Sequence, residues 1–482
     1  MRVNMQFQTS MGINTISPDQ VEEIHLATLE VLDRVGVNIF KKEALTLLKE
    51  RGAYVDNNRV RIPAWMVQEA LASAPSRVAI SNRAGDRAMF LEKGRIHYGT
   101  GSATQYIADI FNGQLRATVK QDVANAAKIA DGLKNVDFVM AMSVASDVAL
   151  HNAFVHEFEA MVLNTIKPIL FCANDLHDLG CITKIAEIVA GGEDALAENP
   201  FIVLYAEPSS PLQLSRETIE KMFYCAEKRV PVICGPAVMM GATGPVSAAG
   251  SLVIANCEIL AGLVMHQLKS KGAPFIYGGG VPPMDMKTFM CSYAAPEEHL
   301  NSAAMVNMAQ YYKLPVFTTS GCSDSPVFDQ QAGMEAGFNL LVHGLAGSNL
   351  IHDLGYMGAG AITSMEMMAL CDETVGMVKH FLKGIEIKPE TLALDIIEQV
   401  GPGGNFFAEE HTFVNFKKYM HFPELLNRHA YDKWKESGGT CFSQRANDKV
   451  KSILENHRVP ELSKDIVNKV KDITKQRDIR GI

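Results

Sequence analysis

The sequence lacks the short motifs that identify several large protein classes. Its nine cysteines include no C-x-x-C pair and no zinc-ribbon spacing, so neither a structural zinc site nor a dithiol redox centre is indicated. No G-x-G-x-x-G follows the first predicted strand, which disfavours a dinucleotide-binding domain. A net charge of −9 over 482 residues argues against nucleic acid or an anionic membrane as the main partner.

Targeting signals are also missing. The amino-terminal residues lack the basic, apolar and small-residue succession of a signal peptide. Scattered cysteines suit a reducing compartment, so we expect a cytoplasmic protein. The longest apolar stretch, Val246 to Met265, has membrane length but contains Asn256 and Glu258 near its centre. We therefore expect a buried helix there and no membrane span.

From about residue 96, short apolar runs alternate with segments of helical periodicity. Each run is followed by a cluster of Gly, Pro, Ser or Asp and then by apolar residues three and four apart. The eight runs are Ile96–Thr100, Phe138–Val144, Pro168–Cys172, Phe201–Ala206, Pro231–Gly235, Pro274–Tyr277, Pro315–Thr319 and Asn349–Asp353. Eight strand–helix units predict an α/β fold, a (β/α)8 TIM-type barrel. An open doubly wound sheet is the alternative.

The two ends differ from this repeating middle. Pro18 and Pro63 each stand in the first turn of a predicted helix, so residues 1–95 predict a helical cap with a short β passage. Residues 96–385 form the barrel. Residues 386–482 predict a helical extension, in which the charged, mixed-sign residues 443–482 are expected to be a solvated arm or an oligomer contact.

In such barrels the chemistry lies on the loops that follow the strands. The eight loops inferred here contain no lysine or arginine, and Lys167 and Lys313 precede their strands, which disfavours Schiff-base chemistry. The loops and strand tips carry both acids and rings: Asp147, Asp175, Glu207, Asp285, Asp324, Asp353, Tyr98, Tyr106, Tyr205, Tyr277, Phe317 and Tyr356. Such a mouth favours a small organic cation, because each ring face attracts quaternary ammonium by about 0.5–2 kcal/mol.

Two sets of candidate site residues follow from this reading. His352 and Asp353 are the catalytic candidates, and the substrate-binding candidates are Tyr98, Tyr205, Glu207, Phe317, Ser320, Asp324, His352 and Tyr356. Structural roles remain open for several of them. Asp175 and Asp324 also suit helix caps, Tyr98 and Tyr277 also suit the outer helical layer, and His352 also suits a hydrogen-bonded core. A metal set of His177, Cys322, His352 and Asp353 is a weaker alternative, because no ligand spacing supports it.

Three separated motifs point to one family. The motifs are Thr319–Asp324 (TSGCSD), Asp329–Glu335 (DQQAGME) and Gly401–Phe406 (GPGGNF), the last followed by Glu410-His411-Thr412. With these, the chain resembles the trimethylamine methyltransferase family, in the branch without pyrrolysine. The resemblance implies a barrel that passes a methyl group from a methylated amine to the Co(I) of a separate corrinoid protein. No cofactor is then tightly bound to the chain itself, since the cobalamin is carried by the partner.

The resemblance also bears on the substrate. Pyrrolysine enzymes of the family hold that residue at the mouth near strand seven, whereas the corresponding stretch here, Ser320–Ser323, has only standard residues. Members of this branch demethylate quaternary amines. Glycine betaine, which would yield dimethylglycine, is the leading substrate, and proline betaine and carnitine are others. A quaternary ammonium leaves as a neutral amine, so no proton need be delivered.

The carboxylate of a betaine finds no basic side chain in the inferred loops. Candidates to meet it are backbone N–H groups at residues 278–280 or 355–360, His352, and a carboxy-terminal segment around Gly403 with His411 folded over the mouth. We also expect a homo-oligomer. A non-catalytic quaternary-amine-binding barrel and a metal-dependent barrel hydrolase are the alternative functions.

Overall fold

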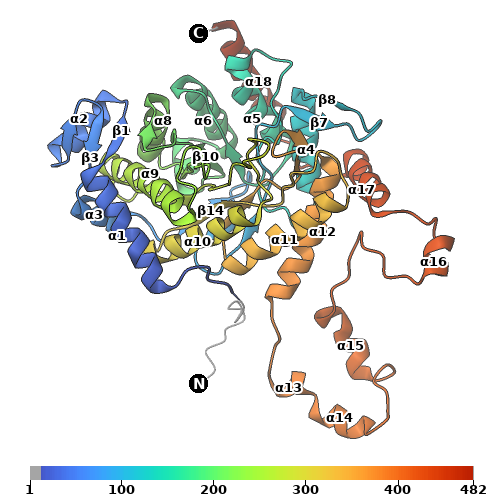
Figure 1. Ribbon diagram of the computed structural model, residues 1–482. Helices are drawn as coiled ribbons and strands as arrows, with labels where there is room; N and C mark the ends of the chain where they lie inside the picture. The colour runs from blue at the N-terminus through green and yellow to red at the C-terminus, as the bar shows by residue number, and fades with distance from the viewer. Residues whose placement is uncertain (1–11, 481–482) are drawn as a thin grey trace.

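A parallel sheet surrounded by helices forms the body of the protein (Figure 1). The computed structural model describes residues 12–480. Seven strands run in the order β6-β15-β14-β13-β12-β10-β9, all pairs parallel. Their bounds are β6 His97–Tyr98, β9 Ile169–Phe171, β10 Ile202–Ala206, β12 Val232–Cys234, β13 Phe275–Gly278, β14 Val316–Thr319 and β15 Leu350–His352.

Residues 138 and 139 occupy the eighth position of the barrel without forming a regular strand. Parallel bridges join Phe138 to Gly99, just beyond β6, and Val139 to Ile169 of β9. The N–H of Val139 donates to Pro168 O at 3.0 Å, and Leu170 N–H donates to Val139 O at 2.8 Å. Because these bonds join the two edges, the sheet closes. The predicted (β/α)8 barrel is confirmed, and the open sheet is excluded.

Each barrel position is followed by a helix of the outer ring, in the alternation that the sequence predicts. These helices are α4 Lys120–Gly132, α5 Ala153–Asn164, α6 Leu176–Ala190, α8 Arg216–Lys228, α9 Ala248–Lys269, α10 Pro296–Tyr312, α11 Gln330–Ala346 and α12 Met365–Leu382. The short helix α7 (Glu193–Glu198) and the 3-10 turn η1 (Leu150–Asn152) extend two of the connections. The alternation places every loop between a strand end and a helix start at one end of the barrel.

Helix α9 is the membrane-length apolar segment. It is the one described helix long and apolar enough to cross a membrane, and 72% of its most apolar window is buried. The polar residues at its centre have partners within the fold: Asn256 donates to Thr28 and Tyr312, and Glu258 accepts from the Leu212 amide at 2.6 Å. The expected buried helix is confirmed.

Residues in the strands alternate between two cores. One core lies inside the barrel and includes Phe138, Leu170, Val203, Ile276 and Phe317, and the other lies between the sheet and the helices. A hairpin of β4 (Val78–Ser81) and β5 (Arg87–Leu91) contributes its apolar side chains to the inner core. The barrel is therefore filled from within, and its chemistry is confined to the carboxyl ends of the strands.

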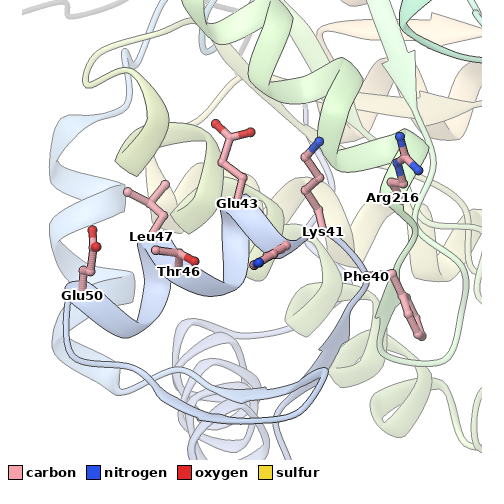
Figure 2. A pocket seen from close by; sticks show the side chains of 8 residues that line it. Phe40, Lys41, Glu43, Thr46, Leu47, Glu50 and Arg216 are labelled. Atoms are coloured by element: carbon pink, nitrogen blue, oxygen red, sulfur yellow. The ribbon is translucent and has the colours of Figure 1, made fainter.

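The amino-terminal cap packs on the outside of α9. It comprises α1 Pro18–Arg34, β1 Val37–Ile39, α2 Lys42–Glu50, β2 Tyr54–Asp56, β3 Arg59–Arg61 and α3 Ala64–Ser73. Its three strands join β11 (Gln213–Leu214) in a sheet of order β11-β1-β3-β2. A hollow of about 710 Å³ lies beside α2, with Phe40, Lys41 and Arg216 on its walls (Figure 2). Seven of the eight residues that line this hollow lie between Phe40 and Glu50, so it belongs to the cap and not to the strand ends.

Two further elements complete the body. A small sheet of order β16-β17-β7-β8, made from Tyr356–Met357, Ile362–Thr363, Tyr106–Ala108 and Leu115–Ala117, follows the ends of the first and last barrel strands. The helices α17 (Phe442–Asn456) and α18 (Lys464–Arg480) dock on the barrel's own helices, α17 on α12 and α4, α18 on α6 and α5. Buried Arg477 of α18 pairs with buried Asp178 at 3.1 Å. The expectation that residues 443–482 form a solvated arm is therefore wrong.

The projecting arm lies earlier in the chain. After α12 the chain leaves the body through α13 (Pro389–Leu392), α14 (Leu394–Val400) and α15 (Glu410–Tyr419), none of which has a buried residue. It returns where the amides of Glu424 and Leu425 donate to Glu373 of α12, and α16 (Tyr431–Glu436) follows. In Figure 1 this segment extends well away from the barrel.

Candidate active site

Three rings stand together inside the barrel at the carboxyl ends of neighbouring strands. The ring centroids of Phe317 and His352 lie 4.2 Å apart, and Tyr205 lies 5.5 Å from Phe317 and 6.4 Å from His352. Phe317 is fully buried, whereas Tyr205 and His352 keep some exposure. The alternation of inward and outward side chains along β10, β14 and β15 brings them together.

His352 and Asp353 form a buried pair at the end of β15. The Nδ1 of His352 lies 3.1 Å from Thr318 O, and because a carbonyl only accepts, Nδ1 carries the hydrogen. Burial lowers the pKa of His352 to about 4, so the neutral ring presents a lone pair on Nε2. Asp353 Oδ1 lies 3.1 Å from that atom, and burial raises the pKa of Asp353 well above its usual range. The lowered pKa of His352 and the raised pKa of Asp353 both disfavour a charged pair at this position.

The backbone around this pair leaves room only for glycine at position 101. A Cβ on Gly101 would lie 2.1 Å from Asp353 Oδ1 and 2.6 Å from Cζ of Tyr356. Tyr356 is buried and its hydroxyl donates to Ser102 O. Asp353 itself has φ of 84°, a conformation that side chains other than glycine adopt at a cost of about 1–3 kcal/mol. The strained backbone of Asp353 and the close packing against Gly101 thus fix the position of the Asp353 carboxyl group at the mouth.

Glu207 stands one step further out, after β10. The hydroxyl of Tyr205 lies 3.2 Å from Glu207 Oε2 and 3.0 Å from Gly235 O, so it donates to one of these acceptors. Desolvation by the surrounding protein raises the pKa of Glu207. Two carboxyl groups, Glu207 and Asp353, therefore approach the rings, and both resist ionisation.

A long loop between β13 and α10 brings a further tyrosine to the mouth. Asp324 accepts from the hydroxyl of Ser292 and from the Tyr293 amide at 3.1 Å. Glu335 in turn accepts from the Asp324 amide at 2.9 Å. Burial is the main cause that raises the pKa of Tyr293, and the nearby carboxyl groups of Asp353 and Glu207 raise it further. The role of Asp324 is therefore to fasten the loop that carries Tyr293.

The outer rim of the mouth is apolar. Val246, Met286, Phe289 and Met290 are 54–71% exposed, and they lie on the loops after β12 and β13. These loops touch, because Met240 bridges to Pro283 and a Cβ on Gly241 would lie 2.6 Å from Cε of Met286. Grouped apolar side chains around an opening indicate a surface for another macromolecule. We call these four residues the rim.

Lysine and arginine side chains lie nearer to the mouth than the loops inferred from the sequence indicated. The loop after β13 runs on to α10 and contains exposed Lys287. The connection from β6 to α4 contains Arg116 in strand β8, where it pairs with Asp109 and Asp122. Lys221 reaches in from α8 and donates to Ala173 O at 2.6 Å. The prediction of loops free of lysine and arginine is thus wrong for two of them, because these loops are longer than their local sequence indicated.

The four residues of the weaker metal hypothesis are His177, Cys322, His352 and Asp353. His177 is exposed at the start of α6, where Asp175 caps the helix by accepting from the His177 and Asp178 amides. Within residues 12–480, no three His, Cys, Asp or Glu side chains are grouped as a metal would require. The structure therefore does not bring the four proposed metal ligands together.

Comparison with known proteins assigns the family. The family described as trimethylamine methyltransferase (MTTB) matches residues 3–481. The chain belongs to this family. A trimethylamine methyltransferase of Desulfitobacterium hafniense (strain DSM 10664 / DCB-2) is 34% identical over 97% of this chain and 94% of its own length. A glycine betaine methyltransferase of D. hafniense (strain Y51) is 31% identical over 96% of this chain and 97% of its own length.

A solved structure supports the fold of this trimethylamine methyltransferase family member. The monomethylamine methyltransferase of Methanosarcina barkeri superposes with a TM-score of 0.51 at 10% identity, covering 93% of this chain and 89% of that chain. At this identity the likeness concerns the fold alone. The curated relatives cited above are methyltransferases by name, so methyl transfer is the activity class of the family.

Two of the predicted substrate-binding residues point away from the mouth. Tyr98 is fully buried in the outer core, and its hydroxyl donates to Leu340 O of α11 at 3.1 Å. Ser320 donates to Asn339 Oδ1 of α11 at 3.0 Å. The predicted substrate-binding roles of Tyr98 and Ser320 are corrected, because alternate residues along a strand face the outer helices and not the mouth. Tyr277 likewise donates outward, to Asn256. The structure brings together Tyr205, Glu207, Phe317, His352, Asp353 and Tyr356.

Most of the groups proposed to meet a carboxylate are also unavailable. The amides of Gly279 and Gly280 donate to Phe317 O and Pro236 O, and those of Gly355 and Gly358 donate to Gly321 O and Ser325 O. The segment that carries Gly403 and His411 extends away from the barrel (Figure 1), so it does not cover the mouth. His352 is occupied as well, because its Nδ1 hydrogen points to Thr318 O and its Nε2 lies 3.1 Å from Asp353 Oδ1.

Sequence reasoning missed Tyr293, Cys172 and Ser102. The Cys172 thiol lies 3.7 Å from the Ser102 hydroxyl, inside the mouth. Tyr293 lies beyond the stretch taken as the sixth loop, and only the distance from β13 to the helix start at Pro296 reveals it. A proline in the first turn of α10 is the signal that would have extended that loop.

Proposed function

We propose that this protein removes a methyl group from a quaternary amine, glycine betaine in the first instance, and transfers it to the corrinoid of a separate protein. The observation that carries the proposal is the uncharged ring cluster of Tyr205, Phe317 and His352 beside two carboxyl groups. The family and the relative named glycine betaine methyltransferase support it.

The cluster suits a trimethylammonium group. Rings attract it through their electron-rich faces by about 0.5–2 kcal/mol each. A His352 held neutral by burial adds an attracting ring instead of a repelling charge. The chemistry of the cluster thus matches the cationic half of the substrate.

The same residues suit the transition state. The N–CH3 bond breaks with its electron pair on nitrogen, so positive charge on nitrogen falls as the reaction proceeds and the amine leaves neutral. A full anion against the nitrogen would stabilise the ground state more than the transition state. Asp353 and Glu207 have raised pKa values, which reduces that penalty, and no proton transfer is needed.

The corrinoid, when bound, supplies the nucleophile that accepts the methyl group. The chain's own contribution is to hold the methyl–nitrogen axis toward the open mouth and to exclude water. Positioning of this kind supplies roughly 7–11 kcal/mol in favourable cases. The rim of Val246, Met286, Phe289 and Met290 offers the partner an apolar surface around the opening.

The experiment is a substrate panel followed in the visible spectrum. Reduced corrinoid protein or free cob(I)alamin is mixed with the enzyme and glycine betaine, proline betaine, carnitine, choline or trimethylamine. We expect methylcobalamin with a betaine. Choline, which lacks the carboxylate, separates recognition of the cation from recognition of the anion. Binding of betaines without any methyl transfer would refute the proposed activity and favour a binding protein.

A further inference from the structure

The arm that leaves the barrel exposes apolar side chains without a core of its own. We define the arm as residues 384–422, which includes α13, α14 and α15. Its most exposed apolar residues include Ile385, Leu394, Ile397, Phe407, Phe413, Val414, Met420 and Phe422, from 52% to 91% exposed. A helical segment this short is marginal in water unless it packs on something. The arm therefore needs a partner surface.

The amount of apolar surface indicates the kind of contact. At about 60–120 Å² for each large aliphatic side chain and 150 Å² or more for each phenylalanine, the arm exposes roughly 500–900 Å² of apolar surface. A standard protein interface buries about 800 Å² per partner, and permanent interfaces are the more apolar ones. Monomers rarely expose patches larger than a few hundred Å². The arm thus has the size and character of one side of a permanent interface.

The body of the same chain also exposes apolar side chains on α11 and α12, among them Phe338, whose ring lies 5.9 Å from that of His299 in α10. Met334 and Phe338 of α11 are 70% and 51% exposed, and Met377 and Phe381 of α12 are 44% and 53% exposed. We call these four residues the α11–α12 face. The two helices pack together, and a Cβ on Gly333 of α11 would lie 3.6 Å from Leu370 of α12.

The charged side chains of α12 are engaged elsewhere, because Asp372 accepts from the Asn135 amide, Glu373 accepts from the amides of Glu424 and Leu425, and Lys379 pairs with Asp137. Helix α11 contains one charged residue, Glu335, and its carboxylate accepts from Ser323 and from the Asp324 amide, toward the loop after β14. An outer helix that is apolar on its exposed side is normally covered. The arm starts at the end of α12, beside this face (Figure 1).

We propose that two copies of this chain dimerise by exchanging arms, the arm of each copy packing on the α11–α12 face of the other. One chain carries both complementary surfaces, so a twofold pair satisfies both contacts at once and closes the assembly. The N-cap residue of α12, Ser364, donates its amide to Gly355 O beside the mouth, and the helix ends at Leu382. The arm therefore departs at the barrel end opposite the mouth.

The test measures the mass of the full chain by size-exclusion chromatography with light scattering. We expect twice the single-chain mass of 52.7 kDa. Two double variants, Phe407→Glu with Phe413→Glu in the arm and Met334→Glu with Phe338→Glu on the face, should each run as monomers. A matched control, Phe111→Glu with Leu150→Glu, changes residues 73% and 77% exposed outside both surfaces and should stay dimeric. Circular dichroism melting verifies that each variant is folded.

Mixing the two monomeric variants distinguishes arm exchange from other dimers. One arm–face contact remains intact in the mixture, so a heterodimer should form, whereas an arm–arm or face–face dimer leaves no intact contact. A monomeric native chain, a native dimer that survives either double variant, or a mixture that stays monomeric would each overturn the proposal. So would an arm that associates only with added corrinoid protein.

Discussion

Replacing Tyr205 by leucine should selectively weaken recognition of positive charge. The ring of Tyr205 lies 5.5 Å from Phe317 and 6.4 Å from His352, and leucine keeps an apolar side chain without the electron-rich face. Losing one ring face removes about 0.5–2 kcal/mol, which corresponds to roughly a 2- to 30-fold loss of affinity. The loss should appear with glycine betaine and be absent with 3,3-dimethylbutyrate, its neutral-carbon isostere.

Calorimetric titration of both ligands measures the effect as the ratio of their affinities. Tyr205→Phe keeps the ring and loses only the hydroxyl that lies near Glu207 and Gly235, so its ratio should remain near that of the native protein. Tyr98→Leu is the second control, because Tyr98 faces α11 and should affect only thermal stability. If Tyr205→Leu lost affinity equally for both ligands, the ring would contribute to the shape of the site and not to recognition of charge. That result would refute the reasoning.

Three further outcomes are expected. Gly101→Ala should abolish methyl transfer, because its Cβ would lie 2.1 Å from Asp353 Oδ1, whereas Gly180→Ala, with open space around it, should retain full activity. Met286→Glu in the rim should raise the KM for the corrinoid protein but leave the rate with free cob(I)alamin unchanged; an equal effect on both acceptors would contradict the docking role. Burial lowers the pKa of His266 from 6.5 to about 3. Between pH 6.5 and pH 3 the unfolded chain therefore binds one more proton at His266 than the folded chain, so the free energy of unfolding falls as the pH falls. His266→Leu should remove about 2 kcal/mol of that loss at pH 5, and an unchanged pH profile of denaturant unfolding would contradict the assignment.

The barrel was predictable because it rests on a repeating pattern. Seven of the eight apolar runs became strands within a residue or two of their expected bounds. The eighth, Phe138–Val144, closes the barrel through isolated bridges, and a run of apolar residues does not distinguish a regular strand from such a connection. The pattern reports burial on both faces and not the hydrogen bonds themselves.

The site was only partly predictable, since it depends on which face of a strand each residue occupies. Tyr98 and Tyr205 both lie in apolar strands, yet one faces the helices and the other the mouth. A shift of one residue exchanges the two outcomes. Tyr293 depends on a loop whose length is set by where the next helix begins. The arm could not be placed from the sequence because its helices α13, α14 and α15 bury no residue, so no burial pattern marks where it packs.

The most direct measurement of the central claim is single-turnover methyl transfer from glycine betaine to the reduced corrinoid protein. The absorption of the Co(I) form should disappear as methylcobalamin forms, with one dimethylglycine released for each methyl group transferred. The native protein and Tyr205→Phe should both react, and Gly101→Ala should not. An unchanged Co(I) spectrum with every betaine of the panel, under conditions in which the betaines bind, would contradict the account.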